Sequence, residues 1–115
     1  ISFGLKYLLM EGYLIMGSGN IVHNLRLLEW ANPSGTSATI EFDQYISKAV
    51  LENDVDNVIN YTAHPHASYA APTPDHYLPL IYILGASEGA TPTVFNQSYN
   101  SGSLSMTGFI FEDNQ

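Results

Sequence analysis

Two histidines stand in settings that could hold a reactive group. His23 follows the turn GSGN at residues 17–20, which comes directly after an apolar run at residues 13–16. A strand end followed by a glycine turn suits a reactive side chain. Glycine allows backbone conformations that are closed to other residues, and the strand fixes the position of the turn. From these residues alone, His23 could equally well pack against or cap the next element.

His76 lies in a Pro-Thr-Pro-Asp-His segment that resembles the start of a helix. The positive end of a helix dipole disfavours a protonated imidazole, so the ring there should stay neutral and able to ligate a metal. The plain alternative is a surface histidine beside Asp75. His64 and His66 flank a proline in a loop-like stretch, and we interpret them as solvated loop residues.

Composition narrows the classes of function. The 115 residues fit one small domain, and 45% of them are hydrophobic, which is enough for a core. The formal net charge of -8 argues against binding nucleic acid or an anionic membrane surface. Because cysteine is absent, a metal would have to be held by His, Asp or Glu, and the cytoplasm is the expected compartment.

The first half of the chain predicts helices around one short strand. A helix over residues 2–11 should end at Gly12, a buried strand should follow at 13–16, and a helix should begin within 21–30 with Leu25, Leu28 and Trp30 facing inward. Residues 32–39 are expected to form a loop. The next helix, 40–53, should bury one face, and Asp54 should cap a short helix after it. The expected buried face consists of Phe42, Ile46 (or Tyr45), Ala49 and Val50.

The second half predicts one helix and two strands. Thr73 is the expected N-cap of a helix with Pro74 at its first position, a bend at Pro79 and an end at Gly85. Residues 91–99 and 102–113 alternate in polarity and are expected to form strands. The predicted fold class is therefore α/β, a mixed central sheet flanked by helices.

Four motifs, read together, resemble a known family. "GYLIMGSGNIVHNLR", "FDQYI", "PTPDHYLPLIYILGA" and "GSLSMTGFIF" occur in the order found in the C-terminal part of the class III extradiol ring-cleavage dioxygenases, closest to the DOPA 4,5-dioxygenase branch. The resemblance implies that residues 1–115 are the C-terminal part of a single catalytic domain. The first residue, Ile1, and the helix-like opening also suggest a piece of a longer or processed chain.

The resemblance also implies a site and a reaction. A mononuclear Fe²⁺, with Zn²⁺ as the alternative, would be held by histidines, with His76 as a ligand and His23 as an acid/base group or a further ligand. Asn24 would orient the ring or the substrate, or would simply make a helix-start hydrogen bond. The substrates would be O2 and a catechol such as DOPA or a related diphenol.

The same resemblance leaves the piece incomplete by itself. The remaining ligands would come from an N-terminal half that is absent here, so we expect the isolated piece to be inactive and to need that half or another chain to complete its fold. The alternative is a non-enzymatic metal- or partner-binding protein of the same fold.

Overall fold

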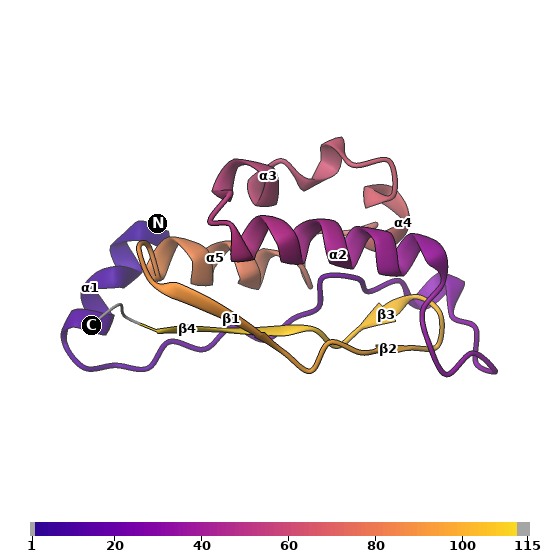
Figure 1. Ribbon diagram of the computed structural model, residues 1–115, viewed down its shortest axis with the longest axis horizontal. Helices are drawn as coiled ribbons and strands as arrows, with labels where there is room; N and C mark the ends of the chain where they lie inside the picture. Colours follow the sequence, from indigo (N-terminus) through magenta and orange to yellow (C-terminus); the bar gives the residue numbers. More distant parts are fainter. Residues whose placement is uncertain (1, 113–115) are drawn as a thin grey trace.

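Helices cover one side of small antiparallel sheets in the computed structural model, which describes residues 2–112 (Figure 1). The long helix α2 and helix α5 lie above the strands. The α/β prediction is confirmed. The elements are, in order, η1 Ser2–Leu5, α1 Lys6–Met10, η2 Leu25–Leu27, α2 Ser37–Leu51, α3 Val55–Ile59, η3 Tyr61–Ala63, α4 Ala67–Ala70, α5 Leu78–Ala86, β1 Thr91–Phe95, β2 Tyr99–Asn100, β3 Leu104–Ser105 and β4 Gly108–Glu112.

The strands form two antiparallel pairs. β1 pairs with β4 from Thr91↔Glu112 to Phe95↔Gly108, and β2 pairs with β3. An isolated bridge joins His23 to Leu104 and so connects the first histidine motif to β3.

Helix α2 supplies the centre of the core. Its N-cap is Thr36, whose hydroxyl accepts a hydrogen bond from the backbone of Thr39. The predicted buried face is confirmed, since Phe42, Ile46 and Val50 are fully buried and Ala49 nearly so. The cap at Asp54 is confirmed as well, because its carboxylate accepts from the backbone N–H of Asn57.

Two predicted elements in the first half are wrong. Residues 13–16 belong to no strand, and Leu14 and Met16 are more than four-fifths exposed. In place of a helix within 21–30 there is only the 3₁₀ turn η2. Leu25 and Trp30 face solvent, with exposed fractions of 61% and 84%, while Leu28 is half-buried. Apolar runs this short do not distinguish a buried element from an exposed one.

The second half needs three smaller corrections. Helix α5 starts at Leu78, not after Thr73, because Pro79 lacks an N–H and is accommodated in a first turn without losing a hydrogen bond. The helix continues through Gly85 to Ala86. The expected closing strand is divided into β3 and β4, and its last residue, Asp113, lies outside the described residues. In the described part of the chain, no helix has the length and hydropathy needed to span a bilayer.

Candidate functional site

His23 and His76, far apart in the sequence, lie face to face. Their ring centroids are 3.6 Å apart and the ring planes differ by 21°. Both residues are half-buried, so the pair is supported on one side and accessible on the other. The structure thus brings together the two histidines that the sequence analysis selected.

The backbone around His23 is held on two sides. The N–H of His23 donates to the carbonyl of Ala70 at 2.8 Å. On the other side, residues 22–24 are joined to residues 103–105: the N–H of Asn24 donates to the carbonyl of Ser103, and the N–H of Ser105 donates to that of Val22. This two-sided pairing fixes the direction in which the His23 ring leaves the chain.

The glycine turn holds the backbone of His76. The N–H of Asn20 donates to the carbonyl oxygen of His76 at 2.8 Å. A Cβ atom added at Gly19 would overlap that same oxygen and lie 3.2 Å from Cγ of Pro79. Only glycine allows this approach, so the turn before His23 is a packing contact with the segment that carries His76.

The charges around the pair favour a neutral His23. Burial lowers the pKa of His23 below its ordinary value of 6.5, and the neighbouring His76 lowers it further. Asp75 opposes this shift only weakly; its Oδ2 lies 3.5 Å from Nε2 of His76. A hydrogen bond from the hydroxyl of Thr73 is the main cause that lowers the pKa of Asp75.

Within residues 2–112, no group of three or more His, Cys, Asp or Glu side chains is arranged to hold a metal ion. The two imidazoles are a chemically suitable half of a site for iron or zinc, because imidazole ligates both metals. A mononuclear centre at this pair would need ligands from elsewhere.

Asn24 is buried and its side chain is engaged locally. Its Oδ1 accepts from the N–H of Arg26 as the cap of η2, and its Nδ2 donates to the carbonyl of Tyr69 at 2.7 Å. These contacts favour the helix-start role, and substrate contact by Asn24 stays a prediction.

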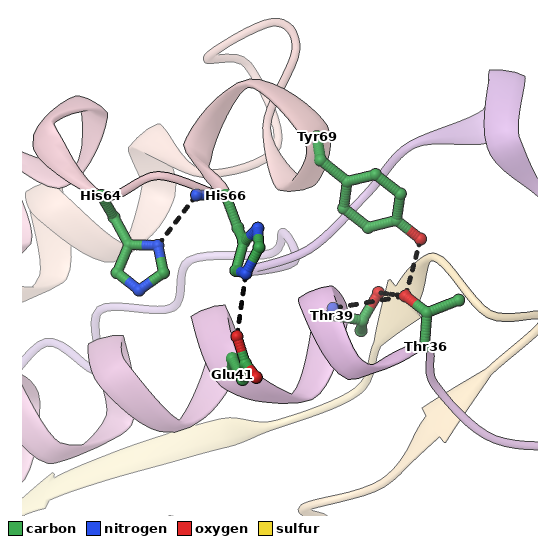
Figure 2. A network of polar contacts seen from close by, with 6 residues as sticks. All are labelled: Thr36, Thr39, Glu41, His64, His66 and Tyr69. Carbon is green, nitrogen blue, oxygen red and sulfur yellow. Dashed lines mark hydrogen bonds and ion pairs between the residues drawn. The ribbon is translucent and has the colours of Figure 1, made fainter.

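The other two histidines attach helix α4 to helix α2 (Figure 2). Nε2 of His66 lies 2.8 Å from Oε2 of Glu41, while Nδ1 of His64 accepts from the backbone of His66. The hydroxyls of Tyr69 and Thr36 are 2.8 Å apart on the same side. Because α4 supplies the carbonyl that holds the N–H of His23, these contacts support the site from outside.

Two hollows lie beside the glycine turn and helix α5. A cavity of about 100 Å³ adjoins His76 and the glycine turn. A larger apolar groove of about 420 Å³ lies between residues 14–17, α5 and the paired strands β1 and β4. The apolar side chains that line this groove are Leu9, Leu14, Ile15, Met16, Ile83, Ala86, Phe95, Phe109, Ile110 and Phe111.

Sequence reasoning missed several buried polar residues that support the pair. Ser103 and Ser105 are fully buried and so is Asp43 on α2. The signal available for the serines was their alternation in an expected strand, which places them on one face.

Comparison with known proteins relates the sequence of this chain to proteins named as extradiol dioxygenases. The chain is 38% identical over 101 residues to a protein of Escherichia coli K12 named 4,5-DOPA dioxygenase extradiol, and 33% identical over 105 residues to a protein of the same name from Portulaca grandiflora. These matches include 84% and 88% of this chain. No family model matches the chain.

The chain is therefore a homologue of part of the 4,5-DOPA extradiol dioxygenases, as the motifs predicted. It spans only 37% and 38% of the length of the two relatives, which is consistent with a C-terminal portion. The crystal structure of an uncharacterized protein from E. coli K12 has the same fold, with a TM-score of 0.85 and 34% identity over 94% of this chain and 46% of that one.

Proposed function

We propose that this chain is part of a class III extradiol dioxygenase that inserts both atoms of O2 into a catechol ring, with DOPA or a related diphenol as substrate. The observation that carries the proposal is the stacked pair of His23 and His76, 3.6 Å apart, within the two most specific motifs of the family resemblance. The dioxygenase names of the relatives support the same reaction class.

His76 and His23 are the residues that would hold the metal, with Fe²⁺ as the first choice and Zn²⁺ as the alternative. When bound, iron supplies Lewis acidity toward the catechol hydroxyls and a place to activate O2. The remaining ligands would come from the part of the protein that the relatives have beyond the matched segment.

His23 suits proton transfer because burial and His76 favour its neutral form. A neutral imidazole takes a proton from a catechol hydroxyl through its free ring nitrogen and returns one as the ring opens. The competing role is a further metal ligand, and the two roles differ in whether removal of His23 also removes the metal.

A chimera tests the function directly. This chain replaces the matched segment of the E. coli relative, and the product is purified, checked for folding by circular dichroism and gel filtration, and supplied with Fe²⁺, DOPA and O2. We expect a yellow semialdehyde, lost in His76→Ala together with the metal. If a folded chimera with His76→Ala turns over at the parent rate, the proposed site is wrong.

The same chimera separates the roles of His23. An acid/base role predicts that His23→Ala keeps the metal and loses turnover, whereas a ligand role predicts loss of both. His66→Ala is the matched control, because His66 contacts Glu41 away from the pair. We expect His66→Ala to keep both metal and turnover.

The apolar groove supports the expectation that the isolated chain is incomplete. It is bordered by residues 14–17, where Leu14 and Met16 are exposed, and by the two-stranded β1–β4 sheet. Large exposed apolar surfaces mark interfaces. We expect the chain alone to self-associate in gel filtration and to bind Fe²⁺ or Zn²⁺ weakly; a stable monomer that binds metal tightly would contradict this.

A further inference from the structure

Asn20 ends the glycine turn, and its side chain joins the turn to strand β3. Its Nδ2 donates to the carbonyl of Ser105 at 2.7 Å, 85 residues further along the chain. The same nitrogen lies 3.9 Å from Sδ of Met106. Gly17 and Gly19 give the turn little stiffness of its own, so a side chain that fixes its end has a large effect on its position.

The backbone of the same residue holds the second histidine segment. The N–H of Asn20 donates to the carbonyl of His76 at 2.8 Å. Asn20 therefore makes two hydrogen bonds to different parts of the fold, one from its side chain to β3 and one from its main chain to His76. Because both donors belong to one residue, the side-chain bond fixes where the main-chain donor lies.

Ser105, the side-chain partner of Asn20, is bonded to the residue directly before His23. The N–H of Ser105 donates to the carbonyl of Val22 at 3.1 Å, and the N–H of Val22 donates to the hydroxyl oxygen of Ser105, also at 3.1 Å. Leu104, directly before Ser105, forms a bridge with His23 itself. A short route of hydrogen bonds therefore runs from Val22 through Ser105 and Asn20 to the second histidine segment.

We propose that Asn20 is a positioning residue for the histidine pair, whose side chain sets the distance between the segments that carry His23 and His76. It acts through the two backbones. Without the Nδ2 donor, the carbonyl of Ser105 loses this bond, the glycine turn moves away from β3, and the carbonyl of His76 moves with it. The meaning for metal binding rests on the proposed function, but the spacing of the two rings does not.

Two asparagines give a matched pair of variants. Asn20→Asp keeps the shape of the side chain but places an oxygen, which cannot donate when ionised, opposite the carbonyl of Ser105. Asn96→Asp makes the same change of shape and charge, and it is the control because the hydrogen bonds of Asn96 go to Met106 and Ser98 and not to the histidine segments. Asn20→Ala removes the donor without adding charge and decides the question if Asn20→Asp does not fold.

The first measurement is the nuclear Overhauser effect between the rings of His23 and His76 in the metal-free 115-residue chain, at a pH where both rings are neutral. The ring centroids are 3.6 Å apart, so the parent should give strong contacts between the two rings. We expect these contacts to be lost in Asn20→Asp and in Asn20→Ala, and to be kept in Asn96→Asp.

A second ring contact, in the core, reports general loosening. His64 and Phe42 have ring centroids 5.3 Å apart, and we expect their contact to persist in every variant. If the contacts of the histidine pair survive in both Asn20 variants, the proposal is wrong. It is equally wrong if Asn96→Asp loses them too, or if the contact of His64 with Phe42 disappears together with them. A parent without contacts between the paired rings would refute the stacked pair itself, and with it the proposed function as well.

The second measurement is Zn²⁺ affinity by calorimetry in the chimera with the E. coli relative. Loss of a partner that orients metal ligands lowers affinity by about 10-fold or more. We expect that loss in both Asn20 variants and unchanged affinity in Asn96→Asp. The added carboxylate of Asn20→Asp would by itself favour a cation, so a fall there comes from misplaced ligands.

The two measurements separate this proposal from the proposed function. Unchanged Zn²⁺ affinity in both Asn20 variants would overturn the link between Asn20 and the metal. If the parent chimera binds no Zn²⁺, the metal part of the proposed function fails, while the ring contacts still decide the role of Asn20.

Discussion

Replacing Gly19 by alanine should separate the two histidine segments. The new Cβ would overlap the carbonyl oxygen of His76, a backbone atom that cannot turn aside as a side-chain end can. Gly19 does not have a positive φ angle, so alanine is destabilising there only because of the steric overlap of its Cβ. The overlap also forces apart the hydrogen bond from Asn20 to His76, which is 2.8 Å long.

The size of the effect follows from these two losses. Forcing extra carbon into a packed contact costs about 1–3 kcal/mol, and losing one hydrogen bond costs about 0.5–1.5 kcal/mol. We therefore expect Gly19→Ala to lose roughly 1.5–4.5 kcal/mol of unfolding free energy. With a urea m-value of about 1–3 kcal/mol/M, the midpoint should fall by an amount on the order of 1 M.

Two other glycines provide controls for the urea experiment. A Cβ at Gly4 meets nothing within 4 Å, so Gly4→Ala should leave the midpoint unchanged or raise it slightly. A Cβ at Gly17 would lie 2.8 Å from Cγ1 of Ile83, a side chain that can move, so Gly17→Ala should fall between the two. If Gly19→Ala were as stable as Gly4→Ala, the turn would not be packed against His76 as described.

Three further outcomes are expected. In metal-free protein, the pKa of His23 measured by NMR lies below 6.5, and His76→Asn returns it only part of the way because burial, the larger cause, remains; a parent value at or above 6.5 would contradict this. The native state holds a proton on Asp43 more tightly than the unfolded chain does, so as pH rises from the ordinary pKa of 3.8 the parent should lose stability relative to Asp43→Asn. If the unfolding free energies of the two proteins changed with pH in parallel, the raised pKa of Asp43 would be refuted. Tyr77→Phe should lose about 1–3 kcal/mol in urea unfolding, because the hydroxyl of Tyr77 donates to the buried carbonyl of Val58 at 2.6 Å; a loss under about 0.5 kcal/mol would show that this carbonyl finds another partner.

Local rules predicted the elements that depend on their own residues. The buried face of α2 follows from apolar residues at helical spacing, and the cap at Asp54 follows from a side chain that reaches the next turn. Both depend on neighbours within a few residues, so no knowledge of the rest of the fold was needed.

Elements that depend on distant partners were harder to predict. Residues 13–16 have the composition of a buried strand, but no strand pairs with them within the described part of the chain, and they line the apolar groove instead. The start of α5 was placed too early because Thr73 uses its hydroxyl to bond Asp75 and does not cap the helix. The strand prediction failed for lack of a distant pairing partner, whereas the helix start was misplaced because a local hydrogen bond competed with the cap.

The histidine pair shows most clearly the difference between what local sequence predicts and what distant contacts decide. No spacing rule joins His23 to His76, and the motifs suggested the pair only because both occur in one family. What brings the rings together is the pairing of residues 22–24 with 103–105 and the close contact of the glycine turn with His76.

The burial of Ser103, directly before β3, and of Ser105, within β3, is not indicated by hydropathy. Ser103 and Ser105 stand at alternate positions, so both point to one face of the strand. By polarity that face should be exposed, yet both side chains are fully buried. Ser103 donates its hydroxyl to the carbonyl of Asn24, and the hydroxyl of Ser105 accepts from the N–H of Val22. A polar face is buried when every hydroxyl has a partner, and here those partners lie on either side of His23. The alternating serines are thus part of what holds the site, and substitutions there should affect the histidine pair before they affect the core.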